Sequence, residues 1–247
     1  MAPELREDEN ADDTLVPPNP VDIPTPTKEL SLALEKLATQ TQQLISDLFF
    51  ALLNDAVTVN QFVDAAADII VGANIEAMGM SQMSWDTLME LLGLDIEEVP
   101  HDFRDHYMDL ERLSEAVETC LSDDEKAEYR LLNIAQAEPK EAGQKRYAEN
   151  VSGHSKTEGW VREMDSDPCQ LCTWWWREGR VWRKNHSMPS HKGCACMPRP
   201  VFSEKHIWGV SKAAYAASEA RKKYGDLETR RTVDPAAYTT HASRAKK

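Results

Sequence analysis

The sequence predicts an α+β protein, in which a mostly helical N-terminal region precedes a small antiparallel sheet and a C-terminal helix and tail. Three observations support this fold class. Apolar residues recur at helical spacing through residues 29–150 of the 247-residue chain. Short segments of alternating residues follow between positions 152 and 202. Four of the five cysteines lie in that second part, as expected for a small unit organised around a metal site.

The charge of the chain changes sign between its two halves. Residues 1–138 carry 7 Lys/Arg and 30 Asp/Glu, a net charge of −23, whereas residues 139–247 carry 21 Lys/Arg and 12 Asp/Glu, a net charge of +9. The basic half is expected to face a phosphate-rich or acidic surface, and the acidic half a different partner. An acidic helical surface that only keeps the protein in solution explains the first half equally well.

The N-terminal segment gives no sign of export or of a membrane anchor. Residues 1–28 are acidic and rich in proline, and are expected to form a disordered arm rather than a signal peptide. No apolar stretch predicts a transmembrane helix, so no membrane partner is expected. In a reducing cytoplasm, clustered cysteines are expected to bind metal rather than to form disulfides.

The helical region, residues 29–138, begins with a heptad pattern. The pattern comprises Leu30, Leu34, Leu37, Thr41, Leu44, Leu48 and Ala51. Over about three heptads it predicts a helix packed within its own bundle, with a dimeric coiled coil as the alternative. A second helix is expected after Thr58 as N-cap, with an apolar face of Val59, Phe62, Val63, Ala66, Ile69, Ile70 and Ala73.

Three further helices are expected before the sheet. The first starts after Ser84 and ends at Gly93, and the second covers residues 100–121. The third opens with a capping box, Ser122 to Glu125, is kinked or ended at Pro139, and is followed by a further helical stretch to about Asn150. The second of these carries Cys120 as a buried, inert thiol. His101 and His106 do not share one face of that helix, and are expected at its surface rather than in a metal site.

Residues 152–202 are expected to form the small antiparallel sheet. Strands are predicted between residues 152 and 164, at residues 180–183, and at residues 196–202, where prolines would confine the strand to an edge. Helical turns at residues 173–178 are expected to stop at Gly179. A helix after Ser211 and a mobile basic tail are expected within residues 203–247.

Five residues in this part compete for a tetrahedral zinc site. They are Cys169, Cys172, His191, Cys194 and Cys196. Two close-set soft ligands followed by a second close-set cluster are typical of structural zinc. Cys169 and Cys172 are expected as the first pair and His191 with Cys194 as the second, while Cys196 could replace either of the latter. Four protein ligands leave no place for a catalytic water, which favours structural over hydrolytic zinc.

The run Trp174, Trp175 and Trp176 follows directly after the first cysteine pair. Three consecutive side chains cannot all face one side of a helix. One or two are expected to pack over the metal site, because so small a unit lacks a conventional core. The remainder are expected to form a docking patch.

The order of these motifs resembles the MuF-like phage head morphogenesis domain over residues 139–202, a quarter of the chain. The residues that carry the resemblance are Cys169, Cys172, Gly179, Val181, Trp182, Pro189, His191, Cys194, Cys196 and Val201. The tryptophan run departs from the small apolar residues common there. The resemblance implies a minor capsid protein of a tailed phage, acting beside the portal in prohead assembly and in DNA packaging or ejection. It implies as partners the portal protein or the major capsid protein, and packaged DNA through the basic half. Its location would be the host cytoplasm during assembly, and then the head interior or portal vertex.

Two enzymatic interpretations compete with an assembly role. A capsid maturation protease would need a serine nucleophile with a base beside it, and Ser152, His154 and Ser155 are the compact candidates. No carboxylate partner for them is evident from spacing. An HNH-like nuclease is suggested by Asn185 and His186, but no second histidine follows at the helical distance that such a metal site needs.

Overall fold

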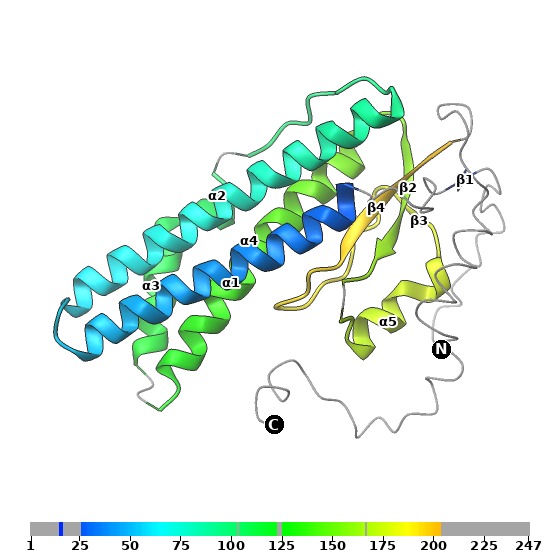
Figure 1. The fold of residues 1–247 in the computed structure, drawn as a ribbon. Helices are drawn as coiled ribbons and strands as arrows, with labels where there is room; N and C mark the ends of the chain where they lie inside the picture. The colour runs from blue at the N-terminus through cyan, green and yellow to red at the C-terminus, as the bar shows by residue number, and fades with distance from the viewer. Residues whose placement is uncertain (1–14, 17–25, 103, 123–124, 166, 204–247) are drawn as a thin grey trace, which may run out of the picture.

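The computed structural model describes residues 15–16, 26–102, 104–122, 125–165 and 167–203. Three long helices, α1 (Pro26–Leu53), α2 (Val59–Leu92) and α4 (Ala127–Gly153), lie side by side, with the shorter α3 (Leu110–Leu121) beside them (Figure 1). A small sheet and helix α5 (Gln170–Trp176) lie at one end of this bundle. The mostly helical α+β architecture that the sequence predicts is therefore confirmed for the described residues.

The sheet has the strand order β1-β4-β2-β3 and its pairs are antiparallel. Its strands are β1 (Leu15–Val16), β2 (Thr157–Glu163), β3 (Trp182–Arg183) and β4 (Met197–Ser203). The three predicted strands are confirmed, but the edge position predicted for the last is wrong, because β4 lies between β1 and β2. Strand β1 pairs only with Phe202 and Ser203. Among the described strands, Pro198 and Pro200 therefore have β2 as their one neighbour, and the N–H that proline lacks is not needed for a bond to β1.

Helix α1 follows the predicted apolar pattern only as far as Thr41. Leu30, Leu34, Leu37 and Thr41 are buried, but the next buried residue is Ile45, while Leu44 is 53% exposed. Two consecutive steps of four residues, from Leu37 to Thr41 and from Thr41 to Ile45, replace the alternating steps of four and three in a heptad pattern. They match the 3.6-residue period of a straight helix rather than the 3.5-residue period of a coiled coil. The helix accordingly packs within its own bundle, against α2 and α4.

Helix α2 is longer than the sequence predicts. Thr58 forms the expected cap together with Gln61, and Gly93 ends the helix at φ 63°, but no second helix begins at Ser84. The Ser84 hydroxyl instead donates to the carbonyl of Pro26 at 2.9 Å, from within the helix. A residue that resembled a cap is thus a contact between α2 and the start of α1.

The helix predicted from Pro100 to Leu121 is divided in the structure. Asp105 and Asp109 each accept a hydrogen bond from a backbone amide two or three residues ahead. These caps begin a short turn, His106–Met108, and then α3 (Leu110–Leu121). Cys120 is buried as predicted, and burial raises the pKa of its thiol.

Helix α4 runs through Pro139 without interruption, and its start differs from the prediction. Ser122 ends α3 instead of capping the next helix, and Lys126, at the start of α4, makes no side-chain cap. Because α4 covers Ala127–Gly153, the expected boundary between residues 138 and 139 falls inside a single helix. Helix α4 therefore belongs both to the helical region, residues 29–138, and to the region that contains the sheet, residues 139–202.

Two apolar clusters fill the bundle, and a third surrounds the cysteines. The cluster near the sheet includes Leu34, Trp85, Tyr147, Trp160 and Phe202, and thus joins α1, α2, α4 and the sheet. The cluster at the other end includes Ile45, Phe62, Ile70, Leu113 and Leu131.

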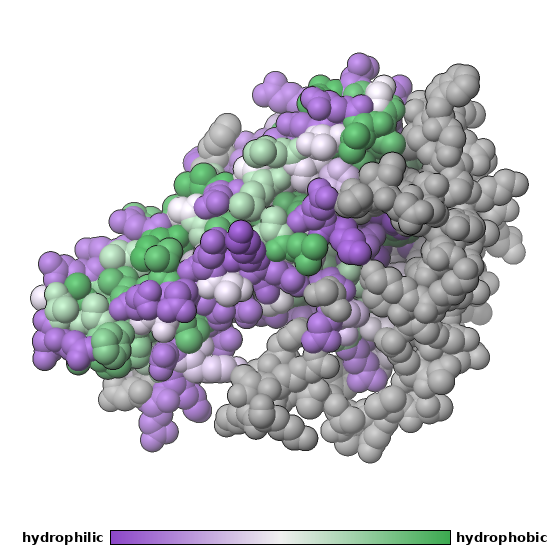
Figure 2. Space-filling view, viewed as in Figure 1, coloured by the Kyte–Doolittle hydropathy of each residue, from purple (hydrophilic) through white to green (hydrophobic). Residues whose placement is uncertain are grey.

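Hydrophilic and hydrophobic residues are interspersed along the visible bundle surface (Figure 2). Among the described helices, none has both the length and the apolar character that a membrane crossing requires. The predicted helix after residue 211, the C-terminal tail and most of the N-terminal arm lie outside the described residues.

Candidate metal centre

The first two cysteines lie at the start of α5. Cys169 is the N-cap residue, and its sulfur accepts a hydrogen bond from the amide of Cys172, with 3.4 Å between the two atoms. This local bond is the reason that a C-x-x-C pair at a helix start brings both sulfurs to one side. The helix therefore begins three residues earlier than the sequence predicts, at Gln170.

The second set of ligands lies on the turn that precedes β4. Gly193 has a φ of 80°, a backbone conformation that favours glycine, and the amide of Cys194 donates to the His191 carbonyl at 3.1 Å. Further on, the amide of Cys196 donates to the Cys194 sulfur at 3.4 Å. Hydrogen bonds from backbone amides stabilise a thiolate, so this turn is built for a deprotonated Cys194.

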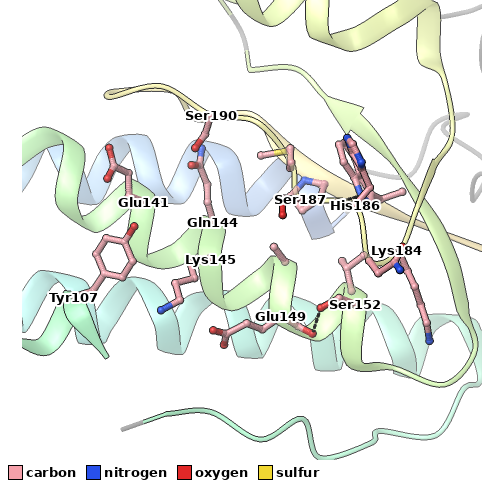
Figure 3. A pocket seen from close by; sticks show the side chains of 16 residues that line it. Tyr107, Glu141, Gln144, Lys145, Glu149, Ser152, Lys184, His186, Ser187 and Ser190 are labelled. Carbon is pink, nitrogen blue, oxygen red and sulfur yellow. Dashed lines mark hydrogen bonds between the residues drawn. The ribbon is translucent and has the colours of Figure 1, made fainter. Parts of the chain in front are cut away.

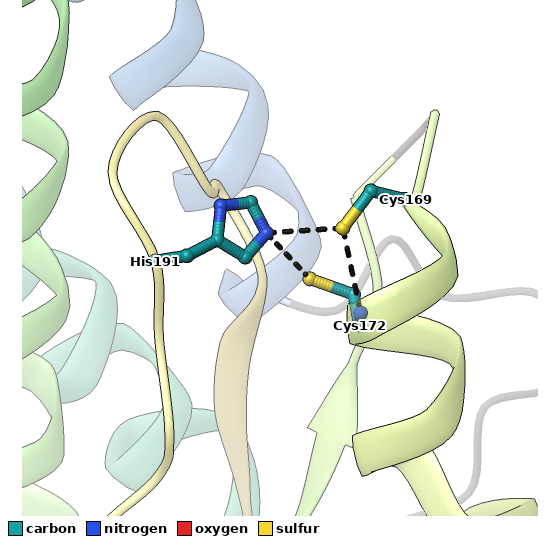
Figure 4. Close-up of side chains that lie close together, drawn as sticks. All are labelled: Cys169, Cys172 and His191. Carbon is teal, nitrogen blue, oxygen red and sulfur yellow. Dashed lines mark hydrogen bonds between the residues drawn. The ribbon is translucent and has the colours of Figure 1, made fainter. Parts of the chain in front are cut away.

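The two turns bring their side chains together (Figure 4). His191 Nε2 lies 3.1 Å from Cys169 Sγ and 3.2 Å from Cys172 Sγ, and Cys172 Sγ lies 3.5 Å from Cys194 Sγ. Tetrahedral zinc with ordinary bond lengths separates its ligands by about 3.6 Å for a nitrogen–sulfur pair and about 3.8 Å for two sulfurs. Cys169, Cys172 and His191 form one group whose ligand atoms all lie within 4.8 Å of one another, and Cys172, Cys194 and Cys196 form a second such group. Cys172 belongs to both groups, and either could hold a metal ion.

The His191 ring is oriented for coordination through Nε2. Its other nitrogen, Nδ1, lies 3.1 Å from the carbonyl oxygen of Lys192. Because a carbonyl can only accept, the hydrogen bond places the proton on Nδ1 and leaves the Nε2 lone pair directed at the sulfurs. A carbonyl acceptor behind a ligating histidine is the usual arrangement at protein metal sites.

Cys196 also lies beside the sulfurs, but its surroundings differ from those of Cys194. Its thiol donates to Asp165 Oδ2 across 3.6 Å, and the same oxygen accepts the amide of Ala195 at 3.3 Å. Hydrogen bonds from Cys172 and Cys196 lower the pKa of Cys194. The bond with Cys172 lowers the pKa of Cys196, but Cys194, burial and the Asp165 carboxylate together outweigh it and raise the pKa. The Cys194 sulfur accepts the Cys196 amide, whereas the Cys196 thiol donates to Asp165, so the hydrogen bonds favour Cys194 as the thiolate of the two.

Arg162 on β2 supplies a positive charge behind the cluster. The residue is only 2% exposed, and its Nη1 lies 3.8 Å from Cys172 Sγ. Its Nη2 donates to the carbonyl of Pro189, and its guanidinium lies 5.3 Å from the centre of the Trp175 ring. Three thiolates around a divalent ion leave one excess negative charge, which a buried guanidinium offsets. The sequence shows Arg162 only as one residue of an alternating strand, and did not indicate this position.

Helices of the bundle hold the backbone of the second turn. Each carbonyl from residue 193 to residue 196 accepts a side-chain hydrogen bond: Lys140 to Gly193 at 3.3 Å, Gln144 to Cys194 at 2.6 Å and to Cys196 at 3.0 Å, and Ser31 to Ala195 at 2.8 Å. Burial lowers the pKa of Lys140, while Glu35 and Asp165 oppose that shift. This turn, residues 191–196 and here called the metal turn, is therefore hydrogen-bonded to α1 and α4 as well as joined to its own sheet.

The three consecutive tryptophans all lie near this centre. Trp176 is buried and packs with Met164 and Cys172, and partly buried Trp174 contacts the same cluster. Trp175 is half-buried, and its ring centre lies 6.1 Å from that of His191. The prediction that one or two of them pack over the cysteines is confirmed, and none of the three is fully exposed.

The protease candidates do not form a catalytic arrangement. His154 is fully buried, its Nε2 lies 3.1 Å from the carbonyl of Asp95, and its Nδ1 accepts the amide of Lys156 at 3.3 Å. The Ser152 hydroxyl donates to the carbonyl of Glu149, and that of Ser155 to the Glu97 carboxylate. Both ring nitrogens of His154 thus have partners other than these serines. The histidine would have no lone pair available to activate either hydroxyl.

A second group that could hold a metal consists of His101, Asp105 and Glu149. The expected surface position of His101 is wrong, because its side chain is 13% exposed and bonds Glu149 at 3.0 Å, whereas His106 is exposed as expected. Lys145 and Arg146 already neutralise the two carboxylates, at 2.6 and 3.3 Å. A salt-bridge cluster accounts for this group without an ion.

Comparison with known proteins identifies neither a family nor a related fold. No protein-family model matches the chain, and no curated protein or solved structure matches it either. The residues around the cysteine cluster are therefore the basis on which a function can be argued.

Proposed function

We propose that Cys169, Cys172, His191 and Cys194 hold one structural zinc ion, and that the protein is a non-enzymatic minor capsid protein of a tailed phage. One observation carries the first part: ligand atoms from two separate turns meet at Cys172, whose sulfur lies 3.2 Å from His191 Nε2 and 3.5 Å from Cys194 Sγ, while Cys169 Sγ lies 3.1 Å from the same nitrogen. A single ion bound by all four residues would draw Cys194 toward Cys169 and His191. Soft thiolate and imidazole ligands favour zinc over magnesium or calcium, which prefer oxygen.

A structural role follows from the ligand set. The proposed site supplies four protein ligands, and Cys172 and Cys194 are each only 1% exposed. A catalytic zinc keeps one position for water or substrate, and this set leaves none. The ion would instead join the start of α5 to the turn before β4, and thereby fix the sheet against the bundle.

The assembly role rests on the resemblance of residues 139–202 to MuF-like head morphogenesis domains. The charge distribution of the chain supports it. The acidic first half and the basic second half offer two regions of opposite net charge, which suits a protein that joins different components. The partners would be the portal protein or the major capsid protein, with packaged DNA at the basic half. The protein would act in the host cytoplasm during assembly, and remain in the head interior or at the portal vertex.

Elemental analysis tests the zinc site. Protein purified without added metal is expected to contain one zinc per chain, and the Cys169→Ser, Cys172→Ser double variant none. Cys120→Ser, which removes a buried thiol outside the cluster, is the control that should retain the zinc. Wild-type protein that carries no divalent ion would overturn the site.

Co-expression tests the assembly role. The chain would be produced together with the major capsid and portal proteins of a tailed phage, and proheads would be separated by sedimentation. The protein is expected to sediment with the proheads, and mass spectrometry is expected to show the same capsid-protein N-terminus with wild type and with Ser152→Ala, Ser155→Ala. A new N-terminus that disappears in the serine variant would establish the protease instead.

A further inference from the structure

We propose that residues 177–192, here called the basic arm, bind single-stranded nucleic acid without sequence preference. The arm connects α5 to the metal turn. The inference rests on the proposed function in one respect, because the zinc ion would hold both ends of the arm in place. His191 is the one proposed metal ligand within the arm, and the contacts proposed for nucleic acid are made by other residues of it.

The basic arm concentrates positive charge in an acidic protein. It carries five Lys/Arg and one Asp/Glu, a net charge of +4, whereas the whole chain carries −14. Arg177, Arg180, Arg183 and Lys192 are exposed, and Lys184 is half-buried. Clustered, exposed cations of this kind attract phosphates, which gives an affinity that falls steeply with salt.

Aromatic rings lie stacked beside these cations. The rings of Trp182 and His186 are nearly parallel, with an angle of 10° between their planes and 4.5 Å between their centres. Trp160, which is 2% exposed, lies 6.0 Å from Trp182 and 6.3 Å from His186, at angles of 21° and 23°, so the three rings form a compact group. The Arg180 guanidinium lies 4.5 Å from the centre of the Trp182 ring. His186 is the exposed member of this group. An unpaired base can stack on such an imidazole, and every base has the flat face that this contact needs.

The stack is held in place by contacts of the folded sheet. Trp160 donates its indole N–H to the carbonyl of His186 at 2.8 Å, and the His186 amide donates to the Arg183 carbonyl at 2.9 Å. A Cβ atom on Gly159 would lie only 2.4 Å from the carbonyl oxygen of Trp182, so glycine is what allows β3 to approach β2 here. A preformed platform loses less entropy when a ligand binds.

A groove of about 350 Å³ runs beside the stack, between α4 and the arm (Figure 3). Lys184, His186, Ser187 and Ser190 lie on the arm side, opposite residues of α4 that include Gln144 and Ser152. The charged residues in its lining, Lys145, Lys184, Glu141 and Glu149, balance to zero. A groove without net charge does not attract phosphate, but its hydroxyl, amide and carboxylate groups suit the polar edge of a base. Phosphates would then lie outside it, on the exposed arginines.

An acidic protein surface is the competing partner, including the acidic helices of a second copy. Such a surface would need the cations alone, and would leave the exposed ring stack without a role. A duplex would also satisfy the cations, but its bases are already stacked on one another. The combination of cations, an exposed stack and a neutral groove therefore favours single strands.

Fluorescence anisotropy with labelled oligothymidine, and with a duplex of equal length, tests the inference on protein whose zinc content has been measured. Oligothymidine is expected to bind more tightly than the duplex, with an affinity that falls between about 50 and about 200 mM salt. Arg180→Glu, Arg183→Glu should weaken binding by more than about tenfold. His186→Ala, which removes the exposed ring of the group, should weaken oligothymidine binding by about 5- to 150-fold. The control, Lys36→Glu, Arg104→Glu, makes the same charge change at exposed positions of the helical region and should bind as wild type does.

Three outcomes would overturn the inference. Folded, zinc-loaded protein that binds no oligothymidine at low salt would do so and leave the zinc site intact. Equal affinity for single strand and duplex, unchanged in His186→Ala, would show that the arm binds phosphates through its charge alone and that the rings do not contact bases. Salt-sensitive self-association without oligonucleotide binding would point to an acidic protein surface. Protein without zinc would instead count against the proposed metal centre, so the two failures can be told apart.

Discussion

Gln144 on helix α4 donates its side-chain amide to the backbone carbonyl of Cys194, with 2.6 Å between the two atoms. A residue of the bundle thus directly holds the turn that carries two of the proposed ligands. Because such a turn is poorly ordered without its ion, metal binding contributes free energy to folding. Because Gln144 lies on α4, which packs in the bundle and contacts the sheet, metal binding is expected to stabilise the bundle as well.

Removal of the metal is therefore expected to destabilise the bundle as well as the sheet. A loss of about 3 kcal/mol would lower Tm by about 6–12 °C in a chain of this size. Thermal unfolding should be followed with and without a chelator, by far-UV circular dichroism for the helices and by tryptophan fluorescence for the sheet. Both signals should shift together. A helical transition that does not move would show that residues 139–202 form an independent unit.

Single serine substitutions are expected to separate the two neighbouring cysteines. Cys194→Ser removes a proposed ligand and should abolish tight zinc binding, whereas Cys196→Ser should retain it, because the hydroxyl can still donate to Asp165. Competition with a chromogenic chelator measures both affinities. The reverse order would assign the fourth ligand to Cys196 and leave Cys194 as the bystander.

The sequence predicts the clustering of the cysteines and His191 because the C-x-x-C spacing and the later cluster are local patterns with few geometric solutions. Thr58, Gly93 and the strands at residues 157–163 and 197–203 were predictable for the same reason. Local patterns also explain the errors. Ser84 and Ser122 look like helix caps, but the structure uses them in a contact with Pro26 and at a helix end.

Contacts between distant parts of the chain were not predictable from one sequence. Arg162 lies ten residues before Cys172, and Ser31 lies 164 residues before Ala195. Neither has a distinctive neighbour in the sequence, and each gains its role only when the sheet docks on the bundle. The same holds for the groove beside the basic arm, whose two walls come from α4 and from residues 184–190.

The ion pair between Lys145 and Asp105 is expected to make stability depend on pH. Burial opposes ionisation of Asp105, but hydrogen bonds from Lys145 Nζ and the Tyr107 amide outweigh it and hold the pKa of Asp105 below its usual value. Such a carboxylate stabilises the fold above its unfolded pKa of about 3.9, and this contribution is lost as the pH falls through the lower, folded pKa.

Urea unfolding of Asp105→Asn should therefore show a smaller free energy of unfolding than wild type at pH 5 to 7, and the difference should shrink below about pH 4. Asp102→Asn is the control, because its pair with Arg104 is exposed and should contribute little. A difference for Asp105→Asn that stays constant down to pH 2 would show that packing, and not charge, stabilises this position.

Gly143 is expected to be a packing position, and Gly72 is not. A Cβ atom at Gly143 would lie 2.7 Å from Leu34 Cδ2 and 3.2 Å from Ser81 Oγ, between α4, α1 and α2. Leu34 is fully buried and has little room to move, so Gly143→Ala should cost about 1–3 kcal/mol despite the better helix propensity of alanine. Gly72 on α2 has no atom within 4 Å of such a Cβ, so Gly72→Ala should stabilise the protein by about 0.5–1 kcal/mol. Chemical unfolding of the two variants beside wild type should thus give changes of opposite sign. A stabilising Gly143→Ala would show that α4 does not pack against α1 at this closest point.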